Sequence, residues 1–239
     1  MELLTWTPVL FAKKEFPRDK NGKPFLPGNV IKEGITSAFI YYYIKKDKEI
    51  ENRIKAYLLK EELEPKEVIN RIKTIISEKY PDIFNFQVAE KIELLEGEIY
   101  TTTAEVFHLK RWEEIESFKV EVFKGKILLP LKIKAIEKLK AAGHSFCEAL
   151  ARMEMKMLGE HPLVETFYQP LLNSMKKWEI PLRIGMWTET RFRGNLLFFW
   201  RIKEVRNKLF EELKTDIRPT KIIYLPREKA TAGWCEIKI

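Results

Sequence analysis

The segment Pro181–Gly194 (PLRIGMWTETRFRG) interleaves arginines with aromatic residues. Guanidinium groups pair with phosphate through two hydrogen bonds, and aromatic rings stack with unpaired bases. This combination predicts a loop that binds single-stranded RNA. In the opposite interpretation, Trp187 and Phe192 pack into the core and the arginines are solvated. The candidate RNA-binding residues of the segment are three arginines, one ring and two glycines: Arg183, Arg191, Arg193, Trp187, Gly185 and Gly194.

A second candidate site lies in the run Lys23–Lys32 (KPFLPGNVIK). Apolar residues recur at helical spacing after it, so Gly28 and Asn29 would expose backbone NH groups at a helix start, where the helix dipole is positive. Lys32 would lie on the first turn. The run could therefore hold a phosphate group. The opposite interpretation is an ordinary strand-to-helix turn that Asn29 caps.

The segment before this run is basic. Between residues 12 and 26 lysines and arginines outnumber carboxylates, and Asn21-Gly22 marks a turn. Its candidate RNA-binding residues are Lys13, Lys14 and Arg18. Because a short stretch joins the first predicted strand to the helix start, we expect these residues and Lys32 to form one positive surface. Such a surface would follow an RNA backbone rather than read bases.

The positive charge of the chain is concentrated toward its C-terminal end. The 239 residues include 43 Lys and Arg against 35 Asp and Glu, a formal net charge of +8. From Arg183 onward, 13 basic residues stand against 7 acidic ones. A basic region favours a phosphate-bearing partner such as nucleic acid or an anionic membrane surface. A thermophile-like surface rich in Lys and Glu would give similar counts without that meaning.

The histidines and cysteines do not indicate a metal or cofactor site. The three histidines are not at metal-ligand spacing, and Cys147 and Cys235 lie in apolar contexts without a CxxC motif. We therefore expect no metal, no cofactor and two core thiols. The sequence also has no apolar run of roughly 18 residues and no signal-peptide pattern, so we expect a cytoplasmic protein without membrane contact.

The elements expected to position these residues indicate an α+β protein with antiparallel sheets. Predicted strands cover residues 3–11, 86–95, 98–109, 117–123, 126–133, 180–187, 221–225 and 233–239. Gly97 and Gly125 are expected at turns between strands. Predicted helices run from the Pro27-Gly28-Asn29 turn to about Lys46, through a helical insertion at 48–80, and over 134–158, 162–178 and 195–214. The order of elements would suit two tandem ferredoxin-like (RRM-like) units, at 1–133 and 134–239.

Three runs resemble sequence patterns of the RAMP superfamily of CRISPR-associated proteins. TPVLF and FLPGNVIKEGITSAF resemble the N-terminal strand, Pro-Gly turn and helix of that family, LRIGMWTETRFRG its glycine-rich loop, and TAGWCEIKI its closing strand. The chain departs from the pattern where Asn29 and Val30 replace two serines and where Glu33 shifts the next glycine to Gly34. The matching positions are Leu26, Pro27, Gly28, Lys32, Gly185, Gly194, Gly233 and Trp234.

Within the superfamily, the chain is most similar to the Csm-type subunit at the 3′-end of the guide RNA in type III-A effector complexes. This resemblance implies tandem ferredoxin-like folds, binding of CRISPR RNA and of neighbouring Csm-type subunits, and no catalytic centre. The resemblance extends over both ends of the chain.

Two alternatives stay open. The first is a metal-independent endoribonuclease of the same superfamily, which processes CRISPR repeats with His108 or His144 moving the proton of a 2′-hydroxyl. Incidental histidines are the simpler interpretation of both residues. The second alternative is an interaction scaffold that never contacts RNA.

Overall fold

A long hairpin dominates the sheet of this protein. In the computed structural model, which describes residues 1–60 and 62–239, strands β4 (Lys91–His108) and β5 (Glu113–Leu128) pair along almost their whole length. The prediction of four shorter strands with turns at Gly97 and Gly125 is therefore wrong. The two glycines face each other inside the hairpin, where a Cβ on Gly125 would lie 2.1 Å from the Glu96 carbonyl oxygen. Glycine is required at both positions because the two backbones approach closely there, and not because the chain turns.

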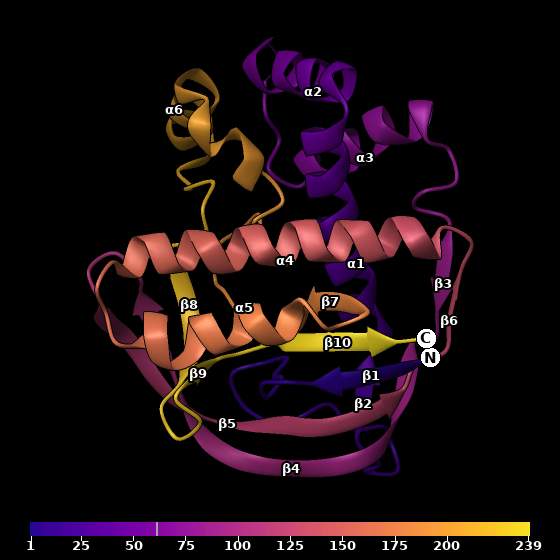
Figure 1. Cartoon of the computed structure of the whole chain (residues 1–239), viewed down its shortest axis with the longest axis vertical. Helices are drawn as coiled ribbons and strands as arrows, with labels where there is room; N and C mark the ends of the chain where they lie inside the picture. Colours follow the sequence, from indigo (N-terminus) through magenta and orange to yellow (C-terminus); the bar gives the residue numbers. More distant parts are fainter. Residues whose placement is uncertain (61) are drawn as a thin grey trace.

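The hairpin is the centre of an antiparallel sheet with the order β7-β10-β1-β5-β4-β8-β9, in which β2 also pairs with β4. A separate pair joins β3 (Phe86–Val88) to β6 (Leu131–Ile133). The two ends of the chain meet in the sheet, because β1 pairs with β10 (Figure 1). The other strands of the main sheet are β1 (Glu2–Thr5), β2 (Phe25–Pro27), β7 (Ile180–Arg183), β8 (Lys221–Leu225), β9 (Ala230–Thr231) and β10 (Trp234–Lys238).

The helices α1 (Gly28–Lys46) and α4 (Ile136–Leu158) pack against each other and contact β7. Figure 1 shows α4 crossing in front of α1, and α2 (Lys48–Lys60), α3 (Val68–Lys79) and α6 (Lys203–Leu213) gathered at the end away from the hairpin. A short π-helix over Val164–Tyr168 leads into α5 (Gln169–Met175). The helix predicted over 195–214 is instead divided into a 3-10 helix (Leu197–Arg201) and α6.

The fold class expected from the sequence is confirmed as α+β with antiparallel sheets. Four neighbouring strands of the sheet have the order β10-β1-β5-β4. Along the chain, α1 lies between β1 and β4, and α4 follows β5. This is the arrangement of one βαββαβ unit whose last strand, β10, comes from the C-terminal end of the chain. The tandem arrangement and the division at residue 133 stay predictions. No helix of the part that the structure describes is long and apolar enough to cross a membrane.

Helices α2 and α3 lie in the segment 48–80, whose role as an insertion stays a prediction, and Asp47 attaches them to the end of α1. One carboxylate oxygen accepts the NH groups of Glu49 (3.0 Å) and Ile50 (3.3 Å) at the start of α2. The other accepts the hydroxyl of Tyr80 (2.6 Å) and pairs with Lys79 (2.8 Å) at the end of α3. Lys79, and then Tyr80, lower the pKa of Asp47 to about 2. One side chain therefore connects three helices.

We expect Asp47→Asn to lower the free energy of unfolding by about 1 kcal/mol at neutral pH, because the ion pair is lost while an oxygen remains to cap α2. Because the pKa of Asp47 is lower in the folded protein, its ionised form stabilises the fold at pH values above the ordinary pKa of 3.8. This stabilisation is lost as the pH falls through about 2. The difference from the parent should therefore shrink as pH falls over this range. Urea denaturation across pH measures it, with exposed Asp82→Asn as the control. A difference independent of pH would contradict the role of the charge.

Candidate nucleic-acid interface

Arg183, at the end of β7, is buried between two indole rings. Its guanidinium carbon lies 4.1 Å from the ring centre of Trp187 and 4.2 Å from that of Trp234. The guanidinium pairs with the buried carboxylate of Glu154 on α4, and its Nε donates to the Ala232 carbonyl oxygen (3.2 Å). Burial raises the pKa of Glu154 although Arg183 opposes the shift. The cluster connects β7, β10 and α4.

The prediction that Arg183 and Trp187 contact RNA is therefore corrected. The side chain of Arg183 is fully buried, and Trp187 and Phe192 are 3% and 1% exposed, so none of the three can reach a ligand in this structure. The interpretation that the rings pack into the core is the one the structure supports. The sequence signal that could have indicated this is Trp234, which lies opposite Arg183 on the neighbouring strand.

Gly185 and Gly194 are buried and shape the loop that follows β7, and their contact with RNA stays a prediction. Gly185 has a φ of +74°, and a Cβ there would lie 2.5 Å from the Leu10 carbonyl oxygen. Its own carbonyl oxygen accepts Nη2 of Arg193 (3.0 Å). Arg193 has a φ of +45° and Gly194 one of +82°, so the chain takes two successive left-handed residues here. This turn directs the Arg193 side chain back toward β7 and α1.

Four cations from three distant segments line one groove with a volume of about 560 Å³, which we call the basic groove. Lys32 comes from α1, Lys73 from α3, and Arg191 and Arg193 from the loop after β7. The described lining has one acidic residue, Glu33, one apolar residue, Ile69, and no aromatic ring. Its neutral polar residues are three amides and two hydroxyls: Asn29, Asn70, Asn195, Thr36 and Ser37.

The charges in the basic groove are only partly neutralised. Arg193 pairs with Glu33 (Nη1 to Oε2, 2.6 Å). Within residues 1–60 and 62–239, Lys32 and Arg191 have no ion-pair partner, and both are exposed. Lys73 lies 5.7 Å from the ring centre of Phe84. The groove can therefore offer several cations to a phosphate-bearing chain.

The other predicted site residues lie outside the described lining of this groove. Lys13 pairs with Glu116 and Glu189, and Arg18 makes two hydrogen bonds to Glu121 (2.7 and 2.9 Å). Carboxylates thus neutralise two of the three candidate cations of this segment. Lys14 is exposed, and its role in RNA binding stays a prediction.

The helix start does not offer the NH group of Gly28 to a ligand. That NH donates to the Glu90 carbonyl oxygen (2.8 Å), and a Cβ on Gly28 would lie 1.8 Å from the Ala89 carbonyl oxygen. Gly28 therefore serves close packing, which corrects its assignment as an RNA contact. Asn29 makes no side-chain capping bond, because Pro27 is the residue before the helix, and it lines the basic groove instead.

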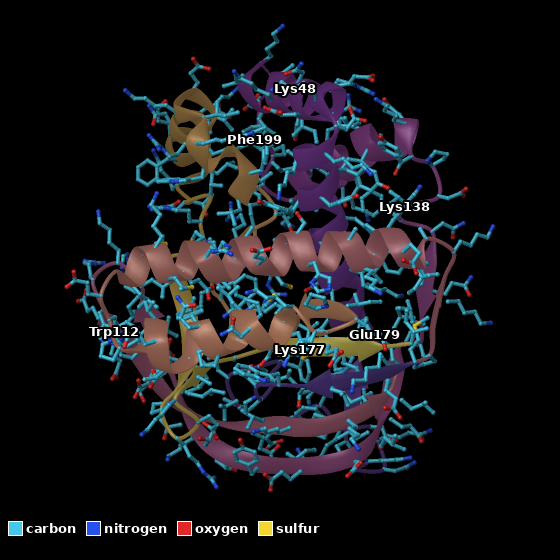
Figure 2. The ribbon with its side chains drawn as sticks, in the orientation of Figure 1. Lys48, Trp112, Lys138, Lys177, Glu179 and Phe199 are labelled. Carbon is cyan, nitrogen blue, oxygen red and sulfur yellow. The ribbon has the colours of Figure 1, made fainter. Side chains whose placement is uncertain are left out.

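The histidines are held in structural contacts. Nε2 of His144 lies 2.9 Å from the Trp178 carbonyl oxygen, and Nδ1 of His108 accepts the Arg111 NH (3.3 Å). His161 lies against the ring of Trp112 (3.7 Å between centres), which Figure 2 labels, and burial lowers the pKa of His161. Both cysteines are buried, as expected. Among the described residues no cluster of His, Cys, Asp and Glu could hold a metal ion.

Sequence reasoning missed the contribution of α3. Asn70 and Lys73 lie three residues apart on this helix and both line the basic groove, as does Asn195 beyond the loop. The spacing of Asn70 and Lys73 places them on one side of the helix. No motif in the insertion distinguished them from an ordinary solvated face.

Comparison with known proteins finds a relative by sequence and solved structures with a similar fold. No protein-family model matches the chain. An uncharacterized protein of Aquifex aeolicus (strain VF5) is 42% identical over 240 residues, which cover 100% of this chain and 99% of the relative. A chain in the cryo-EM structure of a Csm-crRNA-target RNA ternary complex of a type III-A CRISPR-Cas system aligns with a TM-score of 0.60 and 13% identity. That alignment covers 93% of this chain and 75% of the other.

A crystal structure of T. onnurineus Csm5 gives a lower similarity, with a TM-score of 0.49 and 15% identity over 94% of this chain and 73% of the other. The chain is thus an α+β protein that shares its fold with a chain of a Csm complex. The resemblance expected from the sequence is thereby confirmed for the fold. By sequence, the chain belongs to the same family as the A. aeolicus protein.

We expect Arg183→Met to lower the free energy of unfolding by about 3 to 5 kcal/mol, because it leaves the buried carboxylate of Glu154 unpaired. The double variant Arg183→Met/Glu154→Gln should recover part of this loss, since Gln carries no charge. Exposed Arg191→Met is the control and should change stability by less than about 0.5 kcal/mol. Chemical denaturation followed by tryptophan fluorescence measures all three. Equal stability of the Arg183 and Arg191 variants would contradict a structural role for the buried ion pair.

Proposed function

We propose that this protein binds single-stranded RNA in the basic groove, as a non-catalytic subunit of a type III (Csm-type) RNA-guided effector complex. The observation that carries the proposal is the meeting of Lys32, Lys73, Arg191 and Arg193 from three distant segments. Cations that converge from separate elements on an open groove suit a polyanionic chain. The fold shared with a chain of a Csm complex supports the choice of RNA as that chain.

The composition of the groove favours recognition of the sugar-phosphate backbone. Cations pair with phosphate oxygens, and amide and hydroxyl side chains can bond to phosphate and ribose oxygens. Base stacking needs exposed rings, whereas the described lining holds none and the nearby Trp187 and Phe192 are buried. RNAs of unrelated sequence should therefore bind with similar affinity. In a guided complex, sequence is read by base pairing with the guide.

The shared fold supports the choice of ligand and partners. The aligned chain belongs to a structure described as a Csm complex with crRNA and target RNA. We take the guide CRISPR RNA as the ligand of the basic groove and neighbouring Csm-type subunits as the partners. The non-catalytic role is part of the proposal. It is supported by the absence of histidine from the described lining and by the contacts that hold His108 and His144 elsewhere.

Charge reversal tests the proposal. We expect Lys32→Glu, Lys73→Glu and Arg191→Glu each to weaken binding of oligouridylate and of an unrelated RNA by similar factors. Each should also reduce the slope of log affinity against log salt by about 1. Lys138→Glu is the matched control, because this exposed lysine of α4 (Figure 2) lies outside the groove and undergoes the same charge change.

Filter binding over a salt series gives both quantities. The assignment of the groove would be contradicted if the groove variants bound RNA as tightly as the parent. It would also be contradicted if Lys138→Glu lost as much RNA affinity as they did. Loss confined to one RNA sequence would contradict backbone recognition. Site-specific cutting of repeat RNA in EDTA would contradict the non-catalytic role.

A further inference from the structure

The basic groove contains a carboxylate that occupies one of its own arginines. Glu33, on the second turn of α1, accepts a hydrogen bond from Nη1 of Arg193 at 2.6 Å. Nη2 of the same guanidinium donates to the Gly185 carbonyl oxygen (3.0 Å). Two nitrogens of the guanidinium are thus occupied, one by the loop backbone and the other by Glu33.

Carboxylate and phosphate oxygens compete for the same donors. Both are anionic acceptors that bind the NH groups of a guanidinium, so one arginine edge holds either group and not both together. The side chain of Glu33 is about half exposed and that of Arg193 is 30% exposed, so an incoming anion can reach the pair from solvent. An ion pair at this exposure contributes little to folding, and the fold does not depend on it.

We propose that Glu33 stands in for a phosphate at Arg193 in the free protein and must be displaced when the ligand binds. The inference rests on the proposed function for the identity of the ligand as RNA. Lys32 and Arg191 have no ion-pair partner in the described part of the chain, so they meet the first phosphates. Arg193 then becomes available only to an anion that is already held nearby. The pair therefore lowers affinity and favours extended polyanions over isolated phosphate groups.

A double-mutant cycle tests this inference. We expect Glu33→Gln to bind oligouridylate about two- to fivefold more tightly than the parent, the range for release of an exposed ion pair. In the Arg193→Gln background, Glu33→Gln should give no such gain, because no guanidinium remains to be released. Glu67→Gln removes an equal charge from an exposed position just before α3 and is the matched control.

The same cycle with inorganic polyphosphate separates this inference from the proposed function. If Glu33→Gln raises affinity for both oligouridylate and polyphosphate, and both gains depend on Arg193, the inference and the proposed function are both supported. If the protein does not bind RNA but Glu33→Gln raises its affinity for polyphosphate in a way that depends on Arg193, the inference is supported and the proposed function is overturned. Three outcomes overturn the inference: no gain in Glu33→Gln, an equal gain in the Arg193→Gln background, or an equal gain in Glu67→Gln. Thermal unfolding of each variant verifies that it is folded.

Discussion

A guanidinium buried between two indole rings fixes the point from which the arginine-bearing loop of the basic groove begins. Removing the charge of Arg183 from water is unfavourable, and its Nη2 has no hydrogen-bond partner in the described part of the chain. The carboxylate of Glu154 and the faces of Trp187 and Trp234 offset that cost through ion pairing and cation–π contact. The result is a fixed junction of β7, β10 and α4 from which the next loop begins.

The position of the groove depends on three separate anchors. The loop after β7 is held by the Arg183 junction and by the NH group of Met186, which donates to the Leu10 carbonyl oxygen (2.7 Å). The start of α1 is fixed where Gly28 packs against Ala89, and α3 is attached through Asp47. Cations on elements that are held in this way lose little freedom on binding, which favours affinity.

Much of this organisation could be predicted from sequence, and the failures share a cause. The helix beginning at Gly28 was predictable, because the Pro-Gly turn and the apolar period agree. The roles of Gly97 and Gly125 were not, because a glycine needed for close backbone approach has the same sequence signal as a turn glycine. The errors at the site also come from distant contacts, since burial of Arg183 depends on a remote tryptophan and the role of Lys73 depends on where the insertion packs.

Lysine footprinting tests the central claim most directly, because it reports where a ligand covers the unmodified protein. Acetylation rates of individual lysines would be measured by mass spectrometry with and without saturating oligouridylate. Binding in the basic groove predicts slower modification of Lys32 and Lys73, with unchanged rates at the exposed Lys138 and Lys177 of α4 and the α5–β7 turn (Figure 2). Protection of Lys138 or Lys177 with unchanged rates at Lys32 and Lys73 would contradict the account.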